Sequence, residues 1–264
     1  MRRPAFAVAL ALLIVPLARG AAAQDFDLPA PAWPPGPAGP WLERGLPPPR
    51  PRPILEAGVT RWHGLEALAT RSIVGGAGWR AFRGGIGLSQ TGQPDVGWTA
   101  LASVLGAVVP HAGASLRVAG RRDRTTPFAF DAHGAAVGSE AGGGAWVDAG
   151  ERVHVWASAP QIWTRGAAPP LVRPLEIGAA LTLASLAGWC RGTGVAGGAG
   201  GGREAGLSTR AGPCELWLVA RDRPLRGGLG VSARVGALGV AAEIAGHPVL
   251  RETTRLSVAL GGGR

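Results

Sequence analysis

Hydrophobic and polar residues alternate with a period of two over much of the chain beyond residue 54, as they do in β-strands with two different faces. Over 175–189 the odd positions carry Leu, Ile, Ala, Ser and Trp, whereas the even positions are mostly small or polar. Similar alternation recurs over 225–235, 256–260, 153–159 and 112–119. Glycine interrupts almost every window, so helices of about ten or more residues are not expected there. The pattern therefore predicts an all-β domain of antiparallel strands.

The second face of these strands favours a membrane barrel over a soluble sandwich. A sandwich buries one apolar face and presents bulky polar side chains on the other. Here the second face is mostly Gly, Ala, Ser and Thr with scattered Arg and Glu, which suits the lumen of a barrel whose outer face is apolar. We predict an antiparallel transmembrane β-barrel of roughly 12 strands (about 10–14), at about 16 to 18 residues per strand and turn. A soluble, exported β-sandwich or β-sheet binding module is the alternative.

Two segments precede this domain. Residues 1–24 combine two early arginines, an apolar run and Ala-Ala-Ala before the last residue, which is typical of a cleavable secretory signal peptide. Residues 25–53 contain eleven prolines and are expected to be extended or disordered. This Pro-rich segment is either a spacer before the barrel domain of residues 54–264 or a strap or plug at the barrel mouth.

The charge of the chain restricts its partners. All 27 basic residues are arginine, and the formal net charge is +10. The arginines stand singly in apolar segments, without interleaved aromatic residues along one face, so nucleic-acid binding is not predicted. We expect the lipid of the outer membrane of a Gram-negative-type bacterium as the partner, together with other envelope or secretion proteins.

Five tryptophans fall near predicted strand ends or turns. An aromatic girdle at the two membrane interfaces would place them there, although tryptophans of an ordinary core are the alternative. The five are Trp98, Trp146, Trp163, Trp189 and Trp217.

Three segments carry a more specific signal. They are Val-Gly-Trp-Thr-Ala-Leu at 96–101, Pro-Leu-Arg-Gly-Gly-Leu-Gly at 224–230, and the turn His-Pro-Val-Leu at 247–250, followed by Thr-Arg-Leu-Ser at 254–257. Together they resemble the repeated hairpins of bacterial outer-membrane barrels of the PorV and FadL type, over roughly residues 55–264. The resemblance implies an even number of strands, and a role in secretion-associated scaffolding or in uptake of hydrophobic compounds.

No motif for catalysis or cofactor binding is legible in the sequence. The stretch 192–197 matches the dinucleotide pattern G-x-G-x-x-G, but the glycines after it do not favour the helix that this pattern requires. The five histidines lack metal-ligand spacing, and a G-x-S-x-G elbow is missing. We therefore predict a barrel that is not an enzyme and has no cofactor or metal, with a structural or scaffold role or passive transport of small or hydrophobic solutes.

Charged residues on the second face are the candidate lumen residues. Paired Arg and Glu across the interior would be structural, because an unpaired buried charge is costly. An open lumen with this excess of arginine would instead favour anions. The eight candidates are Arg117, Arg152, Glu176, Arg221, Arg226, Arg234, Glu243 and Arg255.

Cys190 and Cys214 are the two cysteines. A disulfide is the usual state in an exported protein, and it forms easily if residues 191–213 are one loop. If residues 204–210 form a strand of their own, the cysteines lie at opposite rims, beyond the distance of about 7 Å that a disulfide allows between Cα atoms. The alternation over 204–210 favours the additional strand, so we predict that the cysteines are unpaired.

Overall fold

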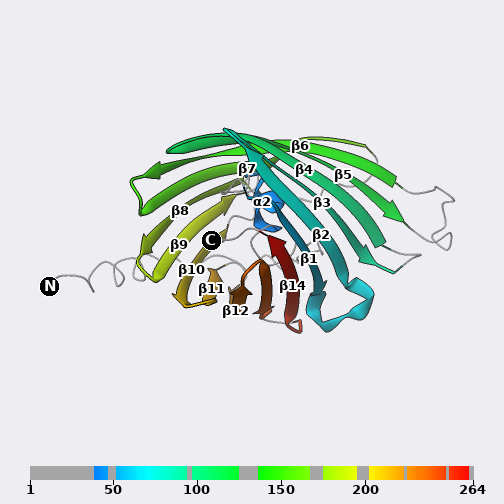
Figure 1. Cartoon of the computed structure of the whole chain (residues 1–264). Helices are drawn as coiled ribbons and strands as arrows, with labels where there is room; N and C mark the ends of the chain where they lie inside the picture. The colour runs from blue at the N-terminus through cyan, green and yellow to red at the C-terminus, as the bar shows by residue number, and fades with distance from the viewer. Residues whose placement is uncertain are drawn as a thin grey trace.

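The computed structural model describes residues 39–46, 52–93, 97–124, 136–166, 175–194, 202–222, 225–247 and 250–261. These residues form fourteen strands that close into one antiparallel barrel, in which β1 pairs with both β2 and β14 (Figure 1). The strands are β1 Ile54–Arg61, β2 Thr70–Trp79, β3 Phe82–Gly92, β4 Gly97–Val109, β5 Ala112–Arg124, β6 Ala136–Ala149, β7 Val153–Gly166, β8 Leu175–Leu183, β9 Leu186–Gly194, β10 Gly202–Ala211, β11 Cys214–Asp222, β12 Leu225–Val235, β13 Leu238–Ala245 and β14 Thr253–Gly261.

The predicted all-β antiparallel barrel is confirmed, and the alternative of a two-sheet sandwich is not what the chain forms. The number of strands is fourteen, not roughly twelve. One reason is the run 175–189, which we treated as a single strand. It is divided between β8 and β9 by a turn at Ala184 and Ser185, in which Ala184 adopts a φ of 52°. Only a few per cent of residues other than glycine adopt this left-handed conformation, so nothing in the local sequence indicates the turn.

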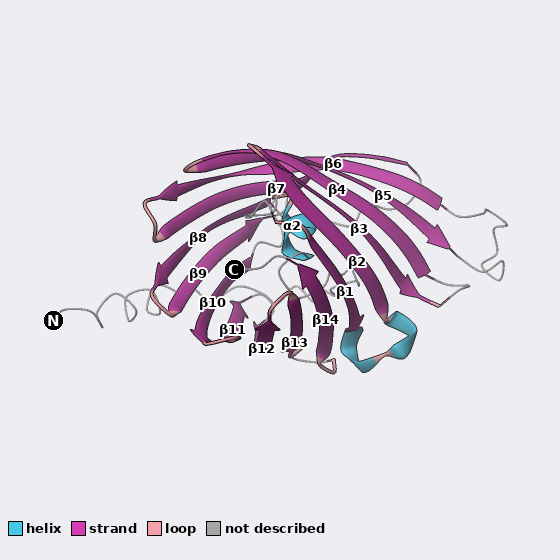
Figure 2. Ribbon diagram, in the orientation of Figure 1, coloured by secondary structure: helices cyan, strands magenta, loops and turns pink. Residues whose placement is uncertain are grey.

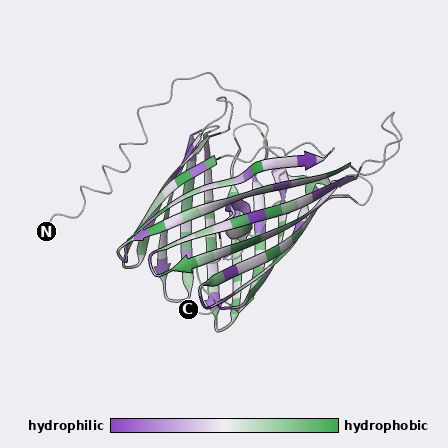
Figure 3. Ribbon diagram, turned by 90° about the horizontal axis from the view of Figure 1, so that it is seen from above, coloured by the Kyte–Doolittle hydropathy of each residue, from purple (hydrophilic) through white to green (hydrophobic). Residues whose placement is uncertain are grey.

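Side chains on the two faces of the barrel wall differ in size and polarity. The large apolar side chains that point outward are exposed, as Leu116, Leu225 and Val235 are at 74, 77 and 76%. Inward positions hold mainly Gly, Ala, Ser and Thr together with charged residues. Figure 3 shows the resulting alternation of hydrophilic and hydrophobic positions along the strands. Hydrophobic residues thus form an outer surface, and no helix or strand of the described residues packs against it.

The two rims of the barrel carry different connections. At one end, hairpin turns of two or three residues join β2 to β3, β4 to β5, β6 to β7, β8 to β9, β10 to β11 and β12 to β13. We call this end the short-turn rim. Most connections at the opposite end are longer, and one includes the 3-10 helices η2 Trp62–Gly64 and η3 Glu66–Leu68. This end is the long-loop rim.

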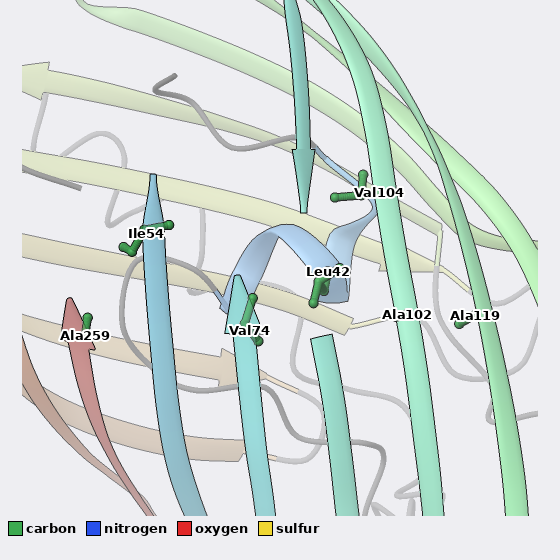
Figure 4. Packing of buried hydrophobic residues seen from close by; sticks show 7 residues of the cluster. All are labelled: Leu42, Ile54, Val74, Ala102, Val104, Ala119 and Ala259. Atoms are coloured by element: carbon green, nitrogen blue, oxygen red, sulfur yellow. The ribbon is translucent and has the colours of Figure 1, made fainter. Parts of the chain in front are cut away.

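A short helix, α2 Gly39–Arg44, lies inside the barrel (Figures 1 and 2). It comes from the Pro-rich segment, so these six residues are helical rather than extended. It packs against β3, β4 and β7, and its Leu42 is fully buried beside Val74 and Val104 (Figure 4). Six residues are too few for a stable isolated helix, so contacts with the wall must hold α2. The remaining residues of 25–51, and the predicted signal peptide 1–24, lie outside the described residues.

The cysteine prediction is confirmed, although with a different placement. Residues 202–211 form β10, which lies between β9 and β11, and both cysteines are free. Cys190 stands opposite Ala205 in the middle of β9 instead of at a rim. Cys214 begins β11 at the short-turn rim.

Candidate functional site: the barrel interior

The interior wall beneath α2 is organised around Arg117 on β5, which is 1% exposed. Its Nε donates to the Leu42 carbonyl oxygen at 2.7 Å. Its Nη1 donates to Glu140 Oε1 at 2.6 Å and to the Pro160 carbonyl oxygen at 3.1 Å. One buried guanidinium therefore links the helix to β5, β6 and β7.

A bulge brings the acceptors of Arg117 into place. Gly142 on β6 faces the irregular stretch of β7 that begins at Pro160. A Cβ atom at Gly142 would lie 2.1 Å from the Ala159 carbonyl oxygen, so only glycine fits there. Beyond the bulge, Gln161 Nε2 donates to Glu140 Oε2 at 3.0 Å, so this half-buried carboxylate is held by side chains from both β5 and β7.

A second cluster holds the C-terminal end of α2. Glu176 on β8 is 5% exposed and receives Arg191 Nη1 at 2.6 Å and the indole Nε1 of Trp156. Arg44, the last residue of α2, lies 3.3 Å from Glu176, and its guanidinium lies 5.6 Å from the centre of the Trp156 ring. Arg191 also donates to Glu204 at 2.7 Å. Because all these charges are paired, this wall can bury them.

The opposite wall, from β10 to β14, has a different character. Its inward positions are mostly small, and its arginines are half-buried or, as Arg210 is, exposed. Arg255 lies 3.5 Å from Glu243, with their side chains 27% and 20% exposed. Arg221 stands directly opposite Arg226 on β12 and, on its other side, opposite Glu204 on β10. The inward face of β11 to β14 has an excess of positive charge, because its four arginines, Arg221, Arg226, Arg234 and Arg255, stand against Glu215 and Glu243.

The eight residues singled out in the sequence fall into three environments. Arg117 and Glu176 are buried in the clusters that hold α2. Arg221, Arg226, Arg234, Glu243 and Arg255 are half-buried on the inward face of β11 to β14. Arg152 differs from the others, because it is exposed in the turn between β6 and β7 and does not lie in a strand.

Sequence reasoning missed most of the acidic partners. Glu140 and Glu204 point inward and pair with Arg117 and Arg191, and Glu215 pairs with Arg210 at 2.7 Å. The excess of arginine over the whole interior is therefore smaller than the eight candidates suggested. Glu204 and Glu215 could have been found from the alternation of β10 and β11, whereas Glu140 lies next to a run of glycines without alternation.

The aromatic girdle is wrong for four of its five tryptophans. Trp98 points inward and lies 5.1 Å from the Arg121 guanidinium. The indoles of Trp146, Trp189 and Trp217 cover cross-strand glycines, as that of Trp156 does. Trp163, 50% exposed near the long-loop rim, is the one that faces outward. A Cβ atom on each covered glycine would lie within 1.9 to 2.4 Å of the ring; the pairs are Trp146 with Gly113, Trp156 with Gly178, Trp189 with Gly206 and Trp217 with Gly230.

These features define a closed antiparallel β-barrel with an apolar outer face and a charged, partly filled interior. Within the described ranges, no group of three or more His, Cys, Asp or Glu side chains could hold a metal ion. No helix in this part of the chain is both long and apolar enough to span a membrane.

Comparison with known proteins finds similarity only among solved structures. No protein-family model matches the chain, and no curated protein matches it. A triple mutant of the porin of Rhodopseudomonas blastica matches with a TM-score of 0.43 and 11% identity, over 80% of this chain and 98% of that chain. Another mutant of that porin matches with a TM-score of 0.42 and 10% identity over the same shares.

Proposed function

We propose that the chain is an outer-membrane β-barrel through which small solutes diffuse passively, with a preference for small anions. The outer face supports the membrane location, because a protein in water rarely exposes so continuous an apolar surface. In known outer-membrane barrels the short turns face the periplasm and the longer loops face outside. The short-turn rim is therefore assigned to the periplasm and the long-loop rim to the cell surface.

The observation that carries the anion preference is the excess of positive charge on the inward face of β11 to β14, where four arginines stand against Glu215 and Glu243. This excess creates a positive potential along the wall, which favours an anion over a cation. Helix α2 occupies the other side of the interior, so the path follows β10 to β14. A scaffold role and uptake of hydrophobic compounds, which the resemblance to PorV and FadL barrels implies, are the alternatives.

Reversal potentials in planar bilayers test the channel. With a KCl gradient across the membrane, the refolded barrel is expected to pass chloride more readily than potassium. The double variant Arg221→Gln/Arg226→Gln should shift the reversal potential toward that of potassium. Arg203→Gln is the matched control, because Arg203 lies at the same rim but faces outward. Bilayers without channel current would favour a structural barrel. An unchanged reversal potential in the double variant would exclude these two arginines as the source of the preference for chloride.

Membrane location is tested separately from conduction. After a carbonate wash of cell envelopes, the protein should stay in the membrane fraction, because an apolar barrel surface has no stable state in water. Recovery in the soluble fraction would contradict the proposal.

A further inference from the structure

Within the described strands, charged side chains at outward positions are confined to one end of the barrel. Arg61 is the last residue of β1, and Arg71 and Arg203 are second in β2 and β10. Arg122 and Arg165 lie within the last three residues of β5 and β7. All five are exposed and point outward at the long-loop rim; we call them the arginine belt. From this level to the short-turn rim, the outward positions of the described strands carry no charged residue.

The belt has little acidic compensation within the described residues. The pair of Arg61 and Glu66 is 3.9 Å long and well exposed, so it stabilises the protein little. Asp222 is the acidic residue at an outward strand position, and it accepts the backbone N–H of Arg203. The guanidinium groups of Arg71, Arg122 and Arg165 make no hydrogen bond or ion pair with another described residue. These three are therefore available to an external anion.

The level of the arginine belt in the membrane indicates where this anion comes from. An arginine on the lipid face costs about 2 to 4 kcal/mol at the middle of a bilayer and about 0 to 1 near its interface. Five arginines at one rim therefore mark the level of lipid headgroups. Guanidinium groups bind phosphate in a bidentate manner, and lipid phosphates are concentrated at this level.

An apolar groove of about 690 Å³ lies beside Arg71 on the outer face of β2, β1, β14, β13 and β12. It runs across the strands between two rows of outward side chains, with Ala57, Ala233 and Ala242 keeping it open. Five adjacent strands span about 19 Å. Its far end at Val231 is the seventh residue of β12 from the long-loop rim, so the groove descends from the headgroup level toward the hydrocarbon.

We propose that the arginine belt binds phosphate-bearing lipids of the surrounding leaflet, and that one such lipid occupies the groove beside Arg71. Its phosphate lies at the Arg71 guanidinium, and an acyl chain follows the groove past Ala242. The inference rests on the proposed membrane location and does not require the barrel to conduct.

Native mass spectrometry of the refolded full chain in an uncharged detergent tests the proposal with three probes. These are dioleoyl phosphatidic acid, dioleoylglycerol with the same chains but no phosphate, and inorganic phosphate. Phosphatidic acid should remain bound, whereas dioleoylglycerol and inorganic phosphate should not. Arg71→Gln should weaken the tightest phosphatidic acid site about tenfold, and Ala242→Phe should weaken it by filling the groove. Arg152→Gln, at the opposite rim, should leave it unchanged.

Each other outcome overturns part of the proposal or all of it. Equal retention of dioleoylglycerol would show a purely apolar site, and competition by inorganic phosphate would show a site for the free anion. Equal losses of affinity for phosphatidic acid in Arg71→Gln and Arg152→Gln would show that the lipid responds to the overall charge of the protein and not to a site beside Arg71. A barrel that stays in carbonate-washed membranes but retains no phosphatidic acid refutes this inference alone, whereas recovery in the soluble fraction refutes the proposed location.

Discussion

The two interior walls of the barrel use the same residue type in opposite ways. Beneath α2, arginine is buried, as Arg117 shows, and its Nε and Nη1 donate to a carboxylate and two backbone carbonyls. Across the interior, Arg255 is half-buried and its ion pair with Glu243 is 3.5 Å long. The difference follows from the helix, because α2 excludes water from one wall and not from the other. Burial makes each partner of Arg117 necessary, since removing one leaves an uncompensated charge.

Arg117→Ala is expected to have the largest effect of all single substitutions in the interior. It removes the ion pair with Glu140 and the hydrogen bond that holds the Leu42 carbonyl, so the barrel should lose about 3 to 5 kcal/mol of stability. Urea unfolding of the refolded barrel, followed by tryptophan fluorescence, measures this loss.

Arg255→Ala is the matched substitution on the opposite wall. Because its pair with Glu243 is partly solvated, the expected loss is about 1 kcal/mol or less. Equal losses in the two variants would mean that the walls do not differ in the way that their burial indicates.

Leu42→Asp should detach α2 from its wall without breaking the barrel. The fully buried leucine would become a carboxylate among apolar neighbours, so roughly 2 to 4 kcal/mol of packing is lost and the helix leaves the interior. Single-channel conductance should then rise severalfold, while Leu42→Val, which keeps the apolar contact, should conduct like the parent. An unchanged conductance in Leu42→Asp would show that α2 does not restrict the path.

The pairs of tryptophan and glycine allow a second comparison of the two interior walls, with smaller expected losses of stability. In Gly178→Ala the new methyl group meets Trp156, which is 4% exposed and held by Glu176, so about 1 to 3 kcal/mol should be lost. In Gly230→Ala it meets Trp217, which is half-buried and can rotate away, so the loss should be about 1 kcal/mol or less. The urea midpoints of the two variants measure these losses of stability. A larger loss in Gly230→Ala than in Gly178→Ala would mean that the wall of β10 to β14, and not the wall beneath α2, is the more rigid.

The success of sequence reasoning depended on whether each strand carried strict alternation. Residues 225–235 alternate Leu and Val with small residues and Arg, and β12 has these bounds. The turn at Ala184 and Ser185 was missed, because apolar Leu183 and Leu186 flank it and it has neither glycine nor proline. A missed two-residue turn reverses the inferred face of every later side chain in the run, so Trp189, which the pattern groups with the outward apolar residues, points inward.

The interior was harder to predict than the barrel wall. Alternation indicates that Arg117 points inward, but its partners come from β6, β7 and α2. The register of β6 against β7 depends on a bulge, and the run of glycines in β6 gives no alternation from which the bulge could be predicted. Helix α2 has too few residues for a periodic signal and lies among prolines. Both features arise from contacts between distant segments, which a local pattern does not encode.

The smallest expected effect concerns the two cysteines, which lie on the strands on either side of β10. Cys190 pairs in register with Ala205 on one side of this strand, and Cys214 with Ala211 on the other. Because β10 lies between them and both thiols are free, a reductant should change the stability of the barrel by less than about 0.5 kcal/mol. In detergent, Cys214 should react with a maleimide faster than Cys190, which is less exposed. A marked loss of stability on reduction, or protection of both thiols, would show a disulfide and remove β10 from between β9 and β11.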